Sequence, residues 1–150
     1  MFWGEVAKES QIFGEIMRSL GLDIGDKRIG VALSDPQGIL ASPLTIIERS
    51  DEQSGIKAIV DIVTQKQVGR IIVGLPLSMD GSISEQAKKV EAFIQELSDY
   101  TEVPIEFRDE RLTTLSAKRL MRDVRKSQKM KDDAVAAALI LQSYLDEVSS

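Results

Sequence analysis

The chain of 150 residues predicts an α/β fold with a mixed five-stranded sheet, three antiparallel strands followed by two parallel ones, flanked by helices. Two observations predict it. Apolar residues alternate with small or polar residues from about Arg18 to Glu48, which is typical of strands joined by short turns. From Ile56 onward, apolar residues at helical spacing alternate with short apolar runs, which is typical of strands connected by helices.

The first two strands are expected at residues 18–24 and 29–34. Leu20, Leu22 and Ile24 alternate with small or polar residues, so we expect Asp23 on the sheet face opposite these aliphatic side chains. Only a tight turn separates the two strands, and strands so close in the chain must pair antiparallel.

The remaining elements follow from turn, cap and periodicity signals. The motif Asp35-Pro36-Gln37-Gly38 predicts a turn. After it we expect, in order, a strand at 43–48, a helix around 56–63, a strand at 70–74, a helix capped by a Ser82–Glu85 capping box, a strand at 103–107, a helix from about Thr113 and a helix from about Asp132. Alanines on one stripe of the last helix permit close approach to a sheet.

Composition excludes several kinds of active site. The chain has no cysteine and no histidine, which removes thiolate nucleophiles, disulfides, typical zinc sites and histidine bases. Hydrolysis would therefore depend on carboxylates, lysines, hydroxyls or a metal ion bound by oxygen atoms. We find no signal peptide and no membrane-spanning segment, so we expect a cytoplasmic protein without a membrane partner.

The charge is unevenly distributed. The chain carries −5 overall, yet residues 108–131 carry +6 and the remainder carries −11. Such a segment is either a solvated helix face or a surface for nucleic acid. Its position beside the acidic motifs described next favours nucleic acid.

Acidic residues occur at three places that the predicted fold brings together. Asp23 lies at the end of the first strand, Asp109 and Glu110 at the end of the fifth, and Asp132 and Asp133 at the start of the last helix. Strand alternation places Glu110, rather than Asp109, on the face of Asp23. Converging carboxylates repel one another, so such a cluster implies a divalent cation, and their hard oxygen atoms suit Mg²⁺ or Mn²⁺.

Four motifs make the sequence similar to the YqgF/RuvX family of Holliday junction resolvases and pre-16S rRNA nucleases. They are LGLDIGDKRIGVALSD (20–35), IIVGLPLSMDGS (71–82), DERLTT (109–114) and DDAVAAALILQSYLD (132–146). The resemblance covers about residues 17–146 in the same order. It implies a ribonuclease H-like fold and a hydrolase acting on ester bonds, a metal-dependent nuclease.

The resemblance also implies which residues act. Asp23, Glu110 and Asp133 correspond to the catalytic and metal-binding carboxylates; Asp109 and Asp132 remain alternatives for the last two. Ala136 and Ala137 stand where related resolvases often carry a further acid, so either one or two metal ions would fit. The side chains expected to hold nucleic acid are Arg28, Ser78, Arg111, Thr113, Lys118, Arg122 and Arg125.

Several functions remain open at this point. The favoured one is processing of the 5′ end of pre-16S rRNA, with ribosomal particles as further partners. The alternatives are resolution of four-way DNA junctions in recombination and repair, a non-catalytic RNA-binding factor of ribosome assembly, and an ATP-binding phosphotransferase, whose second nucleotide-binding half 150 residues cannot supply.

Residues 1–16 lie outside the family pattern. We expect an N-terminal extension there, either an alternative-start segment or an amphipathic, helical one, followed by a single nuclease domain at 17–150. From Met17 onward the sequence shows no obvious large apolar patch, so we expect a monomer or weak homodimer.

Overall fold

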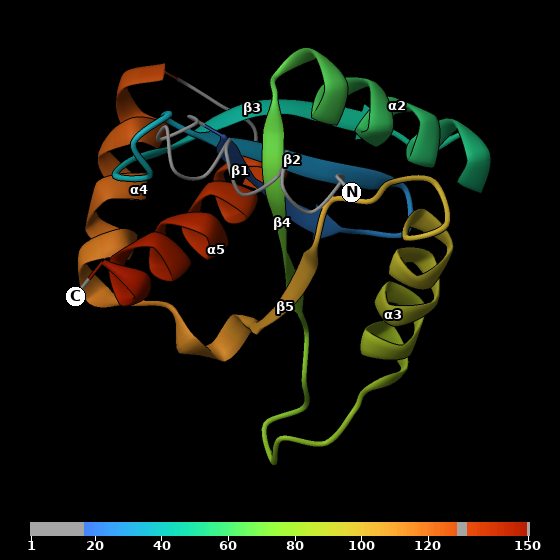
Figure 1. Cartoon of the computed structure of the whole chain (residues 1–150). Helices are drawn as coiled ribbons and strands as arrows, with labels where there is room; N and C mark the ends of the chain where they lie inside the picture. Colours follow the sequence, from blue (N-terminus) through green and yellow to red (C-terminus); the bar gives the residue numbers. More distant parts are fainter. Residues whose placement is uncertain (1–16, 129–131, 150) are drawn as a thin grey trace.

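The computed structural model describes residues 17–128 and 132–149 (Figure 1). Its elements, in chain order, are β1 (Arg18–Ile24), β2 (Arg28–Ser34), β3 (Ala41–Glu48), α2 (Glu52–Gln65), β4 (Val68–Leu75), α3 (Glu85–Leu97), β5 (Ile105–Asp109), the 3-10 turn η1 (Glu110–Leu112), α4 (Leu115–Gln128) and α5 (Asp132–Val148). The order of strands and helices is the predicted one.

The five strands form one sheet in the order β3-β2-β1-β4-β5. β2 pairs antiparallel with β1 and β3, whereas the pairs of β4 with β1 and β5 are parallel. This confirms the predicted mixed sheet. Because β1, β4 and β5 run in the same direction, their carboxyl ends meet at one edge of the sheet.

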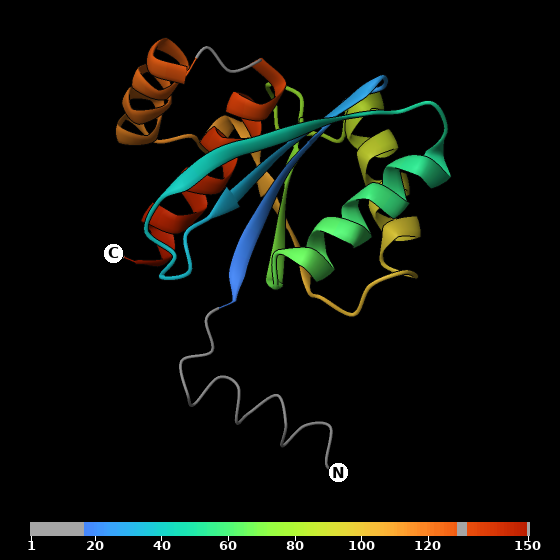
Figure 2. The same ribbon diagram turned by 90° about the horizontal axis from the view of Figure 1, so that it is seen from above.

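Helices cover both faces of the sheet, as Figure 2 shows: α2 and α3 lie on one side, α4 and α5 on the other. The core under α2 and α3 contains large side chains, among them Leu22, Ile59 and Phe93. The core under α5 contains smaller ones, and Ala137 and Ala138 are fully buried there. Because alanine side chains are short, α5 lies close to the sheet, as predicted.

The predicted capping box of Ser82 and Glu85 is wrong. The helix does begin at Glu85, but its N-cap is Ser84, whose hydroxyl accepts a hydrogen bond from the N–H of Ala87 at 3.0 Å. Ser82 instead donates from its N–H and its hydroxyl to Oδ1 of Asp80. A local turn at Asp80 therefore uses the polar groups of Ser82 before the helix starts.

Other boundaries also differ from the prediction. β5 lies two residues later than the strand expected at 103–107, and β4 extends beyond 70–74 at both ends. α4 begins at Leu115 rather than near Thr113, because η1 precedes it and the hydroxyl of Thr114 accepts from the N–H of Ala117 at 3.1 Å. β3 begins two residues before Pro43. It is an edge strand of the sheet, where a residue without an N–H is tolerated.

Within the described ranges, no helix has the length and hydropathy needed to cross a lipid bilayer. The predicted N-terminal extension, residues 1–16, lies outside the described residues, as do Lys129 and Lys131 of the basic segment.

Candidate active site

Asp23 lies in a row of residues that crosses the three central strands. Its pairing partner on β2 is Gly30. On the other side, Leu22 pairs with Val73 of β4, so Gly74 lies at the level of Asp23. Since neither glycine has a side chain, both flanks of the Asp23 carboxylate are open to groups from outside the sheet.

Helix α5 begins directly above Gly30. A Cβ atom at Gly30 would lie 1.9 Å from the backbone oxygen of Asp133, so only glycine admits the helix at this distance. The side chain of Asp133 is thereby brought close enough to Asp23 for their charges to interact. Nε of Arg28, at the start of β2, donates to Oδ2 of Asp133 at 3.0 Å. Arg28 thus balances the charge of Asp133.

Glu110 follows β5 directly and lies above Gly74. A Cβ atom at Gly74 would lie 2.8 Å from Oε1 of Glu110 and 2.5 Å from Cδ1 of Ile140 in α5. Glu110 is therefore on the α5 face, the face that the sequence predicted. The structure brings Asp23, Glu110 and Asp133 to one edge of the sheet, each from a different element.

The carboxyl groups perturb one another. Burial, and after it the charge of Asp133, raises the pKa of Asp23 to about 6. Burial, followed by the charges of Asp23 and Asp109, raises the pKa of Glu110 to about 7. These groups therefore retain protons at a pH at which ordinary carboxyl groups are ionised. A bound cation would remove the cause of this repulsion.

The chemistry of these donors fits a hard divalent cation. All are carboxylate oxygen atoms, which Mg²⁺ and Mn²⁺ prefer. Asp23 and Glu110 are partly buried beside other acids, which raises their pKa values, and a cation bound there would favour their ionised forms. Across residues 17–128 and 132–149, however, no three acidic side chains are close enough together to enclose an ion. Asp133 is bound by Arg28 instead.

The two alternative acids are engaged elsewhere. Asp109 accepts hydrogen bonds from the guanidinium of Arg111, which lower its pKa. Asp132 pairs with Arg125 at 2.5 Å, and its side chain is 81% exposed. Glu110 and Asp133 are therefore the better placed members of each acidic pair.

Comparison with known proteins identifies the family. Residues 17–147 match the RuvX family, which is described as Holliday junction resolvase. The chain belongs to this family. A relative from Roseiflexus sp. (strain RS-1) is 46% identical over 132 residues, 86% of this chain and 94% of the relative. One from Dehalococcoides mccartyi is 50% identical over 127 residues, 84% of this chain and 96% of the relative. Both carry the name "Putative pre-16S rRNA nuclease".

Solved structures share the fold of this RuvX-family chain. RuvC of T. thermophilus, in complex with a Holliday junction substrate, superposes with a TM-score of 0.60 at 10% identity, over 89% of this chain and 96% of RuvC. The fowlpox virus resolvase, in complex with Holliday junction DNA, gives 0.56 at 14% identity, over 89% and 100%. At these identities the likeness shows the fold alone, and it confirms the predicted ribonuclease H-like architecture.

The basic side chains predicted to hold nucleic acid fall into two groups. Arg28, Arg111 and Arg125 are each paired with an aspartate. Lys118 and Arg122 are exposed on α4 and form no ion pair with any other residue that the structure describes. Among the basic residues predicted to bind nucleic acid in this RuvX-family structure, these two are therefore the most available for a polyanion.

A shallow hollow of about 220 Å³ connects this basic face with α5. Its lining consists of three basic and three apolar side chains: Lys118, Arg122, Arg125, Met121, Val135 and Leu139. The ion pair of Arg125 with Asp132 links this rim to the first residue of α5. The basic face of α4 thus leads toward Asp133.

The two hydroxyl residues predicted to contact phosphate follow the ends of β4 and β5. Ser78 lies in the β4–α3 loop, where its N–H donates to the carbonyl of Ser82 at 3.0 Å and its carbonyl accepts from the N–H of Gly81 at 2.8 Å. Thr113 follows η1. Both residues are therefore near the carboxylate edge, though on loops rather than strands.

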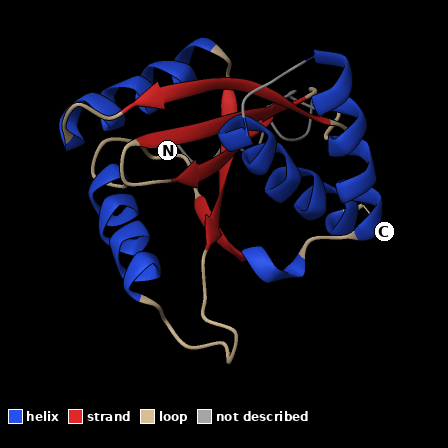
Figure 3. Cartoon of the chain, turned by 180° about the vertical axis from the view of Figure 1, so that it is seen from behind, coloured by secondary structure: helices blue, strands red, loops and turns tan. Residues whose placement is uncertain are grey.

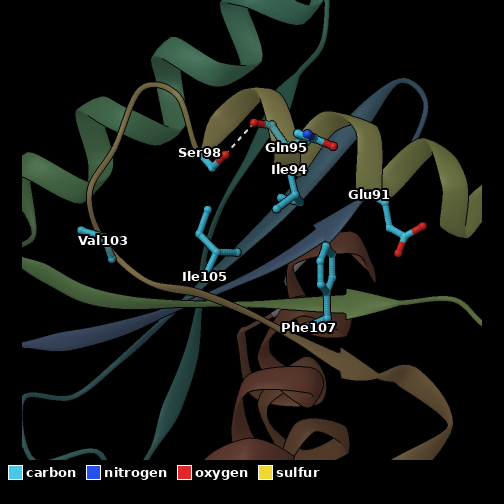
Figure 4. A pocket seen from close by; sticks show the side chains of 7 residues that line it. All are labelled: Glu91, Ile94, Gln95, Ser98, Val103, Ile105 and Phe107. Carbon is cyan, nitrogen blue, oxygen red and sulfur yellow. Dashed lines mark hydrogen bonds between the residues drawn. The ribbon is translucent and has the colours of Figure 1, made fainter.

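A larger hollow, of about 500 Å³, lies elsewhere, between α3 and β5 (Figure 4). Ile94, Ile105 and Phe107 line it together with Glu91, Gln95, Ser98 and Val103. None of the predicted site residues borders it. It is on the α3 face of the sheet, whereas the carboxylates are on the α5 face.

The role of the two glycines was not predicted from the sequence. Its patterns assign Gly30 to a tight turn or a ligand contact and Gly74 to the end of an apolar run. Their function in the structure is to admit Asp133 and Glu110 beside Asp23. The signal that could have found them is the strand register, since each is level with Asp23 on a neighbouring strand.

Proposed function

We propose that this protein is a divalent-metal-dependent nuclease that hydrolyses phosphodiester bonds and processes the 5′ end of pre-16S rRNA. The observation that carries the proposal is the row Gly30-Asp23-Gly74, with Asp133 above one glycine and Glu110 above the other. The names of the two relatives, both about as long as the matched part of this chain, support the RNA substrate.

Asp23, Glu110 and Asp133 would hold Mg²⁺ or Mn²⁺. When bound, such an ion lowers the pKa of a coordinated water and stabilises charge on the phosphate. Asp23, on the central strand, is the fixed member of the set. Asp133 is neutralised by Arg28 and would exchange that partner for the ion. In that case the guanidinium of Arg28 would be free to donate to a phosphate oxygen beside the site.

The exposed face of α4 would hold the nucleic-acid backbone. Lys118 and Arg122 supply positive charge without a described counter-ion, and the hollow that they line leads toward Asp133. Phosphate contacts of this kind position a strand without reading its sequence. The charge therefore supports a polyanionic partner. From the names of the relatives, we propose that this partner is RNA within ribosomal particles of the cytoplasm.

A second candidate is resolution of four-way DNA junctions, favoured by the description of the matching family. The same carboxylates would serve, but the substrate must be cut on two symmetry-related strands, which calls for a two-fold dimer. RNA end processing has no such requirement. A non-catalytic RNA-binding factor and an ATP-binding phosphotransferase are the remaining alternatives, and the following experiment separates all of them.

The decisive experiment incubates the full chain with labelled pre-16S rRNA leader, single-stranded RNA, duplex DNA and a four-way junction, each with Mg²⁺, Mn²⁺ or EDTA. We expect cleavage of the rRNA leader that EDTA abolishes. Symmetric nicking of the junction alone would establish the second candidate. Binding of RNA without cleavage under every condition would identify an assembly factor. Transfer of phosphate from ATP in a parallel incubation with labelled ATP would identify a phosphotransferase.

A further inference from the structure

The loop of residues 76–84, between β4 and α3, projects from the body of the molecule (Figures 1 and 3). Its tip is open to solvent, since Met79 is 96% exposed. The hydrogen bonds within the loop are local: Ser78 with Ser82 and with Gly81, and Ser82 with Asp80. Such bonds fold the loop on itself but do not fix it relative to the carboxylates.

Arg111 joins this loop to the end of β5. Its Nε and Nη2 donate to the carboxylate of Asp109, with Nη2 at 2.6 Å from Oδ2, and its Nη1 donates to the carbonyl of Met79 at 3.1 Å. Gly81 lies beside the guanidinium, since a Cβ atom there would be in van der Waals contact with Nη2, at 3.7 Å. One planar side chain thus bridges the strand end and the loop tip.

Glu110 lies between Asp109 and Arg111 in the chain. Asp109 also accepts a hydrogen bond from the backbone N–H of Arg111 at 2.9 Å, which closes the backbone around Glu110 into the 3-10 turn. Any displacement of Arg111 would therefore alter both the loop and the turn that presents Glu110.

The local charge does not favour a phosphate at Arg111. Asp109 is in direct contact with the guanidinium, and Asp80 is close enough for its charge to interact with it. The charge of Arg108 also acts on Asp109, but Arg108 is itself paired with Glu147. The positive charge of Arg111 is therefore already engaged by its neighbours, whereas Arg122 on α4 has no described counter-ion.

We propose that Arg111 is a positioning residue that fixes the β4–α3 loop against the turn carrying Glu110, and that it does not bind phosphate itself. The consequence for catalysis rests on the proposed function, because it requires Glu110 to act in the site. The structural part does not, since the clamp exists in the protein without substrate.

The test compares Arg111→Gln and Arg111→Lys with Arg122→Gln as a matched control, all in the full chain. Amide hydrogen exchange without nucleic acid reports on the loop through the N–H groups of Ser78, Gly81 and Ser82. Binding of a labelled single-stranded RNA and of a four-way DNA junction, without divalent ions, is measured across a salt series. Exchange in β1 and β4 verifies the fold.

We expect Arg111→Gln to accelerate amide exchange in the loop by about tenfold. The slope of log K for nucleic-acid binding against log salt should stay unchanged in this variant. Arg111→Lys should behave similarly, because one ammonium group cannot bridge Asp109 and Met79 as a planar guanidinium does. Arg122→Gln should leave loop exchange unchanged and reduce the slope by about 0.7 to 0.9.

Unchanged loop exchange in both Arg111 variants would overturn the proposal, as would a slope reduction equal to that of Arg122→Gln. If wild-type protein binds neither probe, the proposed function fails, while the exchange result still decides the clamp. With active enzyme, we expect the Arg111 variants to show a lower kcat with little change in KM. Removal of a group that binds phosphate in the ground state would instead raise KM.

Discussion

Asp23 is the residue on which the proposed chemistry depends most, since the charge of Asp133 acts on it and its own charge acts on Glu110. We expect Asp23→Asn to reduce cleavage of the preferred substrate by at least about a thousandfold while nucleic-acid affinity stays within about twofold of wild type. The matched control is Asp26→Asn, an exposed acid three residues later that pairs with Lys89 at 3.6 Å. Turnover near the wild-type rate in Asp23→Asn would refute the assignment.

The raised pKa values of Asp23 and Glu110 predict how stability depends on pH without metal. Because the folded-state pKa lies above that of the unfolded chain, each group contributes stability that is complete below about pH 4 and lost as the pH rises through 6 to 7. We expect the free energy of unfolding in EDTA to fall between pH 5 and pH 8. For Asp23 this loss is on the order of 1 kcal/mol.

Urea denaturation at both pH values, with wild type and Asp23→Asn, checks this expectation. The variant should lose less stability than wild type on going to pH 8, because it lacks the titrating group and relieves Glu110. Addition of Mg²⁺ at pH 8 should stabilise wild type more than the variant. Identical pH dependence in the two proteins would show that the Asp23 carboxyl group is not perturbed.

At the level of residues, sequence reasoning predicted the convergence of Asp23, Glu110 and Asp133 but not the pairing of the arginines. The acids follow from strand ends, which are visible in hydrophobic patterns. The contact of Arg111 with Asp109 depends on the 3-10 turn between them, and no periodicity signals a single turn.

Among the elements, the contact of α5 with β2 is the closest and the least tolerant of change. We expect Gly30→Ala to destabilise the protein by about 3 kcal/mol or more, because its Cβ would lie 1.9 Å from a backbone oxygen and the helix must move. Gly55→Ala in α2 is the control: its nearest neighbour is the flexible Ile29 Cδ1 at 3.4 Å. It should be neutral or stabilising by up to about 1 kcal/mol.

Thermal unfolding of both variants measures the difference. Gly30→Ala should also lose metal-dependent activity in excess of its loss of stability, because the displaced α5 carries Asp133. A Gly30→Ala variant as stable as wild type would contradict the close approach of the helix.

The exposed face of α4 predicts a measurable electrostatic effect. Removing the charges of Lys118 and Arg122 together should weaken nucleic-acid binding and reduce the slope of log K against log salt by about 1.4 to 1.8, twice the value for one phosphate contact. Arg49→Gln is a suitable control, since Arg49 lies over the ring of Phe93 on the opposite side of the sheet. An unchanged slope in the double variant would show that this face of α4 is a solvated surface that does not contact nucleic acid.

The elements themselves were largely predictable, and the errors occurred where polar side chains compete. The alternation in β1 and β2 and the alanine stripe of α5 each extend over many residues. A prediction from such a long pattern holds even where a single residue departs from it. The start of α3 depends instead on which serine is used by a neighbouring aspartate. The capping-box pattern favours Ser82, which has Glu85 three residues later, over Ser84, and it does not register that Asp80 binds Ser82 in a turn.

For the whole molecule, the prediction concerns assembly. We expect sedimentation at low micromolar concentration to show a monomer or weak dimer, with and without residues 1–16, since RNA processing needs no two-fold symmetry. Comparing the full chain with a chain that lacks residues 1–16 isolates any effect of the apolar side chains in that segment, which include Phe2, Trp3 and Phe13. A tight dimer that nicks junctions symmetrically would reverse the preference for RNA.

The carboxylates are far apart in the sequence, so they leave the ribosome at different times during synthesis. Asp23 is made early, whereas Asp133 arrives with α5, the last element of the fold. Until α5 docks, the glycines at 21 and 30 face no helix, and Asp23 lacks Asp133 as a neighbour. Under the proposed function, a nascent chain without α5 has an incomplete site and would not cleave RNA during its own synthesis.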